Sequence, residues 1–226
     1  MQLHVLPDPA TRLTLLIADG SPAMREGLAR LVNDECDLVV TGSAAGSAEL
    51  RALVRRQAPE VLLLDVALDE SDGLELVKDL AELAPGMRIV IFTAQPEGFY
   101  AERCLRAGAH AFVSKRAQTG ELFRAIRHAA DGGVLMPPAL AFSLLSVGKD
   151  RAQPAPGFAS RLTNRELQVF RLAGLALPTR AIAQRLGVSI KTIESHRENI
   201  KNKLDLASHS ELVAAAAQWV RENGGA

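Results

Sequence analysis

Short apolar runs alternate with amphipathic segments along the first half of the chain. The runs span residues 13–18, 38–41, 61–64, 88–92 and 111–113, and their aliphatic and β-branched residues predict strands. Between them, apolar residues recur every three or four positions, as in helices that bury one face. Strands that alternate with helices build a parallel sheet. We therefore expect a flavodoxin-like α/β domain, a (βα)5 fold with five parallel strands.

The pattern changes after residue 136. Pro137 and Pro138 end the last helix of the sheet domain, and residues 139–147 fit a short linker helix before a connection containing Gly and Pro. From Ser160 onward the pattern predicts four helices, with a tight turn at Gly187 that is typical of a helix-turn-helix unit. We expect an N-terminal extension over 1–12, the α/β domain over 13–136, a linker over 137–159 and a separate all-α domain over 160–226.

Charge is divided unevenly between these parts. The 226 residues include 26 basic and 26 acidic side chains, but the segment from Ala159 to the end has ten Lys or Arg and six Asp or Glu. An acidic part joined to a basic part is typical of a regulatory domain joined to a nucleic-acid-binding domain, although chance also produces a split of this size.

The cysteines and the N-terminal segment bear on where the protein works. Cys36 and Cys104 lie in apolar or helical stretches and form no C-x-x-C pair, so we expect two buried, reduced thiols and neither a disulfide nor a zinc site. Residues 1–11 lack the apolar core of a signal peptide, and no apolar run approaches the ~18 residues that a membrane span requires. We expect a soluble, cytoplasmic protein with no membrane partner.

Four polar side chains follow four strands of the predicted sheet. Asp19, Asp65, Thr93 and Lys115 each come at the carboxyl end of a strand, and these ends meet at one edge of a parallel sheet. Taken singly, each residue has an ordinary explanation as a cap, a solvated charge or a strand former. Together they suit phosphoryl transfer, because a carboxylate can accept a phosphoryl group while an ammonium, a hydroxyl and Mg²⁺ stabilise the developing charge.

The α/β domain resembles the receiver domains of two-component response regulators. The matching segments are Leu15–Asp19, Val61–Asp65, Asp72–Glu75, Ile91–Ala94 and Gly108–Lys115. The resemblance implies that Asp65 is the phospho-acceptor, phosphorylated by a sensor histidine kinase, and that Lys115 pairs with the phosphoryl oxygens. It also implies that Thr93 and Phe112 form the conformational switch.

The same resemblance implies a Mg²⁺ site held by Asp19, Asp65 and the carbonyl of Ala67. The family usually has a second metal-binding acid after the first strand, but this chain has Gly20, so we expect weak Mg²⁺ binding. The family also favours proline four residues after the phospho-acceptor, where this chain has Asp69. Asp69 or Glu70 could compensate for the missing acid. Two interpretations stay open: control by phosphorylation, and an atypical, phosphorylation-independent regulator with a degenerate metal site.

The last domain resembles the LuxR/FixJ type of helix-turn-helix domain, the DNA-binding part of the NarL/FixJ family. The matching segments are Leu162–Glu166, Ile182–Ala183, Leu186–Ser189, Lys191–His196, Asn199–Ile200 and Lys203–Leu204. The departures are mild: Pro178, Ala181 and His209 stand where the family often has a small polar residue, an acid and an arginine. In this family the last helix commonly serves dimerisation, which implies a homodimer, although core packing explains its apolar residues almost as well.

The helix after Ser189 has an apolar face and a polar face. Ile193, Ile200 and Leu204 form the apolar face and should pack on the preceding helices. Seven residues of this helix are candidates for contact with DNA: Lys191, Thr192, Ser195, Arg197, Lys201, Asn202 and Lys203. Those opposite the apolar face can enter a major groove, and the flanking cations can reach phosphates. For His196, which lies nearer the core, burial and a phosphate contact are equal alternatives.

Two other classes of function are weighed against a DNA-binding regulator. An aspartyl-phosphate phosphatase needs a second acid two residues after its nucleophile, and that position is Ala67, so we expect no enzymatic turnover and no small-molecule substrate. A protein-binding module is the other alternative, which retention on a DNA column would count against.

Overall fold

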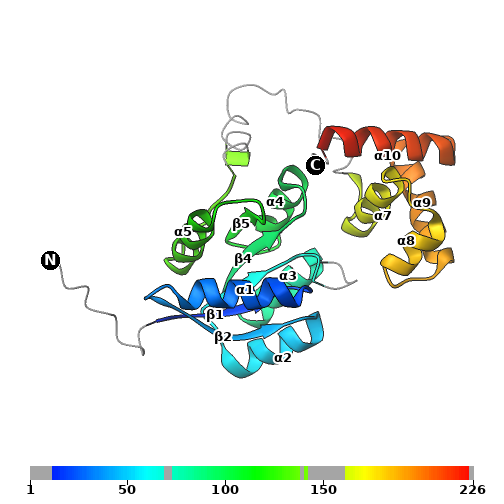
Figure 1. Ribbon diagram of the computed structural model, residues 1–226. Helices are drawn as coiled ribbons and strands as arrows, with labels where there is room; N and C mark the ends of the chain where they lie inside the picture. The colour runs from blue at the N-terminus through cyan, green and yellow to red at the C-terminus, as the bar shows by residue number, and fades with distance from the viewer. Residues whose placement is uncertain (1–11, 69–72, 138–139, 142–160, 224–226) are drawn as a thin grey trace. The chain divides into compact units, whose positions relative to one another are not determined.

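The computed structural model describes residues 12–68, 73–137, 140–141 and 161–223 (Figure 1). The chain divides into two compact units, residues 1–140 and 141–226. Asp69, Glu70 and Asp72 lie outside the described residues, as does the expected linker helix apart from Leu140 and Ala141, which are helical. The expected domain boundaries at 136 and 159 stay predictions.

Five parallel strands form the sheet of the first unit, in the order β2-β1-β3-β4-β5. The strands are β1 (Leu13–Ala18), β2 (Leu38–Ala44), β3 (Val61–Leu64), β4 (Arg88–Thr93) and β5 (Ala111–Ser114). The predicted fold class is confirmed, and β2 continues three residues beyond its predicted end. The extra residues are polar or small, but they pair with β1 after a register shift between Leu15 and Leu16.

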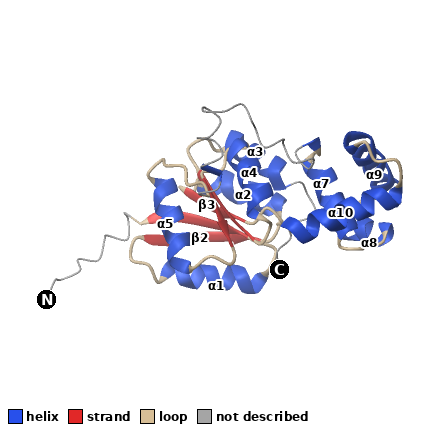
Figure 2. Cartoon of the chain, turned by 90° about the horizontal axis from the view of Figure 1, so that it is seen from above, coloured by secondary structure: helices blue, strands red, loops and turns tan. Residues whose placement is uncertain are grey.

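Helices cover both faces of this sheet (Figure 2). They are α1 (Pro22–Asn33), α2 (Ser47–Gln57), α3 (Gly73–Leu83), α4 (Glu97–Arg106) and α5 (Thr119–Ala130). Leu15 and Ile17 of β1 pack in one core with α1 and α5, while Leu16 and Ala18 pack in another with α2, α3 and α4. The strands are continuous apolar runs because both faces of the sheet are buried.

The two cysteines have different environments. Cys104 on α4 is buried, and burial raises the pKa of its thiol to about 12. Cys36 is exposed, so the prediction that it is buried was wrong. It lies in the turn between α1 and β2, where neither element covers it. Among the described residues, no helix is long and apolar enough to span a membrane.

The second unit consists of four helices in its described part, which confirms the predicted number. They are α7 (Asn164–Gly174), α8 (Thr179–Arg185), α9 (Ile190–Leu204) and α10 (His209–Asn223). The sequences Thr163–Glu166 and Ser208–Glu211 both have the Ser/Thr-x-x-Glu pattern of a capping box. Thr163 and Glu166 form this box at the start of α7. At α10, Glu211 N–H donates to Ser208 Oγ, but the Glu211 carboxylate accepts from Ala207 N, so only half of the box forms.

The turn between α8 and α9 passes through a residue that favours glycine. Gly187 has φ +61°, a left-handed conformation that costs other residues energy. Trp219 of α10 packs edge-on against Phe170 of α7, with ring centroids 6.0 Å apart. The apolar residues of α10 therefore serve the core of their own domain, and α9 is held on a fixed scaffold.

Candidate phospho-acceptor pocket and nucleic-acid interface

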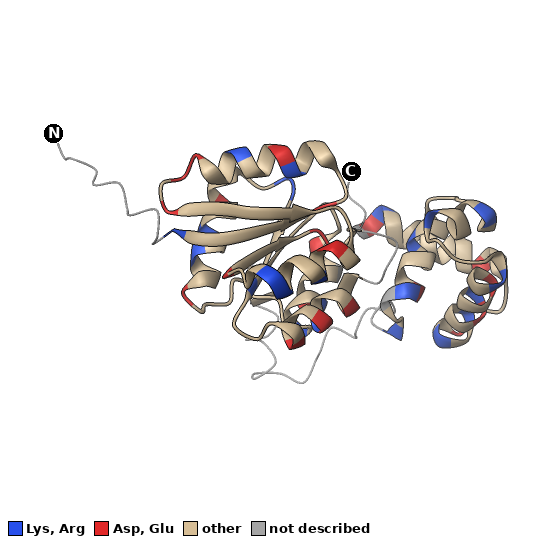
Figure 3. Ribbon diagram, turned by 90° about the horizontal axis from the view of Figure 1, so that it is seen from below, with Lys and Arg blue, Asp and Glu red and all other residues tan. Residues whose placement is uncertain are grey.

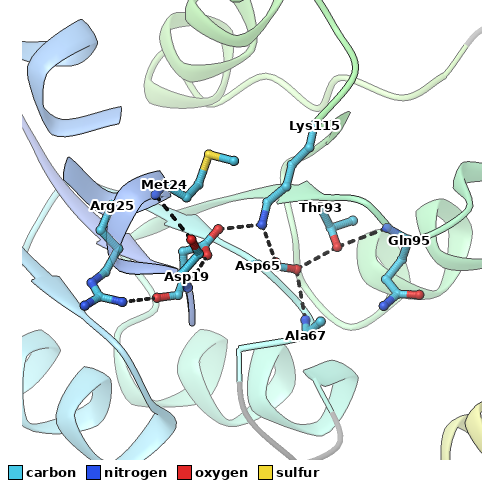
Figure 4. Close-up of polar contacts among 9 residues, drawn as sticks. Asp19, Met24, Arg25, Asp65, Ala67, Thr93, Gln95 and Lys115 are labelled. Carbon is cyan, nitrogen blue, oxygen red and sulfur yellow. Dashed lines mark hydrogen bonds and ion pairs between the residues drawn. The ribbon is translucent and has the colours of Figure 1, made fainter. Parts of the chain in front are cut away.

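Asp65, the first residue after β3, accepts hydrogen bonds from three directions (Figure 4). Thr93 Oγ1, at the end of β4, donates to Asp65 Oδ1 over 2.7 Å, and the N–H of Ala67 donates to the same oxygen over 3.0 Å. Lys115, just after β5, places Nζ 2.5 Å from Asp65 Oδ2. The structure thus brings these predicted residues together at the carboxyl ends of the strands.

Lys115 also holds the second carboxylate of the pocket. Its Nζ lies 2.5 Å from Asp19 Oδ2, and the Lys115 side chain is only 15% exposed. Burial by itself would lower the pKa of Lys115, but hydrogen bonds and charge attraction from Asp19 and Asp65 outweigh burial and raise it. The lysine is therefore a charged bridge between two nearly buried acids.

Asp19 is further fixed by two residues, of which the sequence indicates one, Ser21 before Pro22, as a helix cap and does not single out the other. Ser21 N–H donates to Asp19 Oδ1 over 2.8 Å, and the guanidinium of Arg25 donates to the backbone carbonyl of Asp19 over 2.7 Å. Ser21 is also the N-cap of α1, so the start of that helix sets the geometry of the acid. The Ser-Pro cap signal predicts the helix start but gives no sign of the Arg25 contact.

The metal-binding capacity of the pocket rests on few donors. Asp19 and Asp65 supply carboxylates, and Mg²⁺ prefers such oxygens, so these residues fit the ion with a reduced ligand set. The described part of the chain holds no cluster of three or more His, Cys, Asp or Glu that suits a metal. A Cβ placed on Gly20 would lie 3.0 Å from the carbonyl oxygen of Leu68, so the loop after β3 closes over the position of the usual second acid.

Phe112 lies on β5 and is part of the apolar core. It is 4% exposed and packs in the same apolar core as α2, α3 and α4, together with Tyr100 of α4. Thr93 on the adjacent strand is fully buried and pairs with Ser114, two residues after Phe112. Both predicted switch residues are therefore buried on neighbouring strands, and Thr93 is bonded to Asp65.

The exposed face of α9 contains three of the predicted DNA-binding residues. Lys191, Ser195 and Asn202 are exposed, opposite the buried Ile193 and Ile200. The helix has four basic residues and two acids, so it is not uniformly basic (Figure 3). A helix that packs by its apolar face on the other three helices and exposes a polar face has the form needed to enter a major groove.

The other four candidates have partners within the protein. The N–H of Thr192 donates to Ser189 Oγ over 3.0 Å, which caps the start of α9. Arg197 Nη1 donates to Thr179 Oγ1 over 2.7 Å. The remaining two are lysines in ion pairs: Lys201 with Glu198 at 2.8 Å and Lys203 with Glu166 at 2.7 Å.

Lys203 and His196 both face α7 rather than open solvent. Glu166 of α7 is nearly buried; burial acts to raise its pKa, but Lys203 and Thr163 outweigh this and lower it. The pKa of half-buried His196 is lowered by burial and then by Arg165, against an opposing effect of Glu166. Of the two alternatives for His196, this environment supports packing.

Comparisons with known proteins agree with both resemblances. A family model described as the response regulator receiver domain matches residues 15–127, and one for bacterial regulatory proteins of the luxR family matches residues 160–216. The transcriptional regulatory protein YxjL of Bacillus subtilis is 30% identical over 207 residues, which cover 91% of this chain and 95% of YxjL. The transcriptional regulatory protein UhpA of Escherichia coli is 31% identical over 200 residues, which cover 88% of this chain and 95% of UhpA.

Solved structures show the same architecture. RcsB from Salmonella enterica serovar Typhimurium, solved with a promoter and the phosphomimetic BeF3⁻, matches with a TM-score of 0.63 and 22% identity, covering 91% of this chain and 98% of RcsB. A LuxR-family regulator from Aurantimonas sp. SI85-9A1 matches with a TM-score of 0.56 and 27% identity, covering 62% of this chain and 99% of that one. The chain belongs to the two-component response regulators, with a receiver domain followed by a LuxR-type DNA-binding domain.

Proposed function

We propose that this protein regulates transcription by binding DNA in response to phosphorylation of Asp65 by a sensor histidine kinase. The observation that carries the proposal is the convergence of Lys115, Thr93 and the N–H of Ala67 on the Asp65 carboxylate. Three donors on one strand-end carboxylate suit a site where negative charge accumulates. Ala67 supplies no general acid, which supports a regulator rather than an enzyme that turns the phosphate over.

In the proposed transfer, a carboxylate oxygen of Asp65 attacks the phosphorus of a phosphohistidine. The O–P bond forms as the P–N bond breaks, and the imidazole leaves with its electron pair. Lys115 and Thr93 already donate to different oxygens of Asp65, so each can follow the charge onto the phosphoryl oxygens. The product is an acyl phosphate held by the same donors.

Asp19, Asp65 and the carbonyl of Ala67 would hold Mg²⁺, the cofactor we propose. When bound, the ion offsets the negative charge of the phosphoryl group. Two carboxylates instead of the usual three support weak binding, because each missing acid removes a charged oxygen ligand. Gly20 therefore supports a high Mg²⁺ requirement rather than a loss of function.

The proposed output is a change in the surface around α4 and β5. Phosphorylation draws Thr93 away from its present bond to Asp65, and Phe112 repacks behind it, since both side chains are buried and buried cores are close-packed. We propose that this promotes a homodimer that places two α9 helices on a two-fold DNA site in the cytoplasm. Lys191, Ser195 and Asn202 would face the bases.

The test uses a small-molecule phosphodonor. Purified protein is treated with acetyl phosphate and Mg²⁺, and intact-mass spectrometry measures phosphoryl incorporation. We expect labelling of the wild type and of Asp79→Asn, a control at an exposed acid on α3, but no labelling of Asp65→Asn. Labelling of Asp65→Asn at the wild-type level would exclude the assigned acceptor. Equal DNA affinity of labelled and unlabelled wild type, measured by fluorescence anisotropy, would favour the phosphorylation-independent alternative.

A further inference from the structure

Three nitrogen-containing side chains gather where α8, α9 and α10 meet. Arg197 of α9 donates from Nη1 to Thr179 Oγ1 of α8 over 2.7 Å, and the same nitrogen lies 3.4 Å from Nε2 of His209, the first residue of α10. Lys201, one helical turn after Arg197, acts electrostatically on His209 as well. The cluster of Arg197, Lys201 and His209 thus draws on α9 and α10, and the Thr179 hydroxyl of α8 lies at its edge.

The guanidinium of Arg197, at the centre of this cluster, forms no ion pair with an acid among the described residues. Within the described part of the chain, no carboxylate comes within 4.0 Å of Arg197, and its Nε is buried without a hydrogen-bond partner. Burial lowers the pKa of Arg197, with a weaker opposing effect from Glu194. Lys201 is paired, but its partner Glu198 is 61% exposed, so solvent screens that pair. Such a partly desolvated cation is stabilised when an anion arrives.

His209 is the member of the cluster that can change its charge near neutral pH. Burial and the charges of Arg197 and Lys201 lower the pKa of this exposed imidazole. On its own helix the nearest acid is Glu211, whose carboxylate is engaged with the N–H of Ala207. On the side of α8 the cluster meets the uncharged Thr179. The lowered pKa favours the neutral form of His209, whereas a negative charge nearby would offset the two cations and favour the protonated form.

We propose that Arg197, Lys201 and His209 together bind one phosphate of the DNA backbone, and that His209 takes up a proton as the phosphate arrives. The inference rests on the proposed DNA binding by this unit and adds a pH-dependent contact to it. Arg197 and protonated His209 donate directly, and the Thr179 hydroxyl, which accepts from Arg197, keeps its own proton for a phosphate oxygen. The consequence is a DNA affinity that falls as pH rises.

The experiment measures binding of the full-length protein to a fluorescein-labelled random-sequence duplex by anisotropy, between about pH 6 and pH 8. For the wild type we expect Kd to rise by up to about tenfold per pH unit over part of this range, because one proton is bound with the DNA. His209→Gln should bind more weakly at low pH and lose that dependence. His209→Arg should bind tightly across the range, because arginine stays charged. His128→Gln, an exposed histidine on α5, should behave as the wild type.

Salt dependence gives a second readout at the acidic end of the range. Arg197 and Lys201 still hold the phosphate in His209→Gln, so the slope of log K against log salt should become shallower by at most about 0.9, the value for one whole phosphate contact. Equal pH dependence and equal salt slopes in the wild type and His209→Gln would overturn this inference and leave DNA binding intact. Failure of the wild type to bind the duplex in a salt-dependent way at any pH would instead refute the proposed function.

Discussion

Replacement of Lys203 by methionine separates a structural role from a role in DNA binding. Lys203 Nζ lies 2.7 Å from Oε2 of Glu166, and the same oxygen accepts the N–H of Thr163 over 2.7 Å. The Glu166 side chain is 5% exposed and that of Lys203 39%. Methionine keeps the aliphatic stem but leaves a nearly buried carboxylate without its cation.

The cost follows from this burial. Removing one partner of a fully buried ion pair costs about 3–5 kcal/mol, whereas exposed pairs contribute less than about 1 kcal/mol. Since Glu166 is buried but Lys203 is partly screened by solvent, we expect a loss of about 1–2 kcal/mol in the free energy of unfolding of the second unit. For a domain of this size, that corresponds to a decrease in Tm of about 5–10 °C.

The pH dependence of this loss has a defined sign. The pKa of Glu166 is lowered in the folded state, because Lys203 and Thr163 outweigh the effect of burial. The pair therefore stabilises the fold fully above the unfolded pKa of glutamate, about 4.3, and loses this contribution as pH falls through the lower folded value. The difference in stability between the wild type and Lys203→Met should be constant near neutral pH and shrink below about pH 4.

Trp219 provides the assay, because it is the only tryptophan of the chain and packs on Phe170 in this unit. Its fluorescence during urea denaturation reports the stability of the DNA-binding domain. The matched control is Lys201→Met, which breaks a pair with the largely exposed Glu198 and should change stability by less than about 0.5 kcal/mol. If Lys203→Met proved as stable as Lys201→Met, the reasoning would be wrong and Lys203 would remain a candidate for DNA contact alone.

Two further substitutions test local geometry. Gly20→Asp should raise the Mg²⁺ affinity, measured by calorimetry, by about tenfold or more because it restores an acid; unchanged affinity would contradict this. The same change should cost about 1 kcal/mol of stability, because the new Cβ would lie 3.0 Å from the carbonyl oxygen of Leu68. Ala176→Gly should stabilise the second unit by about 0.5 kcal/mol in urea denaturation, because Ala176 has φ +59°, whereas Ala214→Gly inside α10 should destabilise it by about 1 kcal/mol; a loss at both positions would contradict the assigned strain.

The strands of the sheet could be predicted from the sequence, because a strand that is buried on both faces is an uninterrupted run of apolar residues. Where that condition failed, so did the prediction: the end of β2 is Gly42–Ala44, which has no apolar run, and its pairing depends on β1. Cys36 was expected to be buried because it was placed in an apolar or helical stretch, but it lies in the turn between α1 and β2 and is exposed. Such positions depend on the path of the chain in space.

The pocket was predictable as a set but not in its contacts. Parallel strands bring their carboxyl ends together, so Asp19, Asp65, Thr93 and Lys115 had to meet. Lys115 bridges Asp19 and Asp65 because its long side chain extends along the edge of the sheet to both carboxylates. No local sequence pattern predicts this contact. The Lys203–Glu166 pair joins residues 37 positions apart in the sequence. Each residue was interpreted only within its own helix, Lys203 as a DNA contact and Glu166 as part of a capping box.

We expect the charge of the pocket to link Mg²⁺ binding to phosphorylation. Before phosphorylation, two carboxylates and the bridging ammonium of Lys115 leave a net charge of about −1, and the ammonium occupies the oxygens that face a cation. A phosphoryl group on Asp65 makes that residue about −2, so the pocket gains negative charge while Lys115 is drawn to the phosphoryl oxygens. We expect the same event to free Asp19 and to increase the attraction for Mg²⁺. In this protein, metal binding should be coupled to phosphorylation more tightly than in a receiver that has a third acid to hold the ion beforehand.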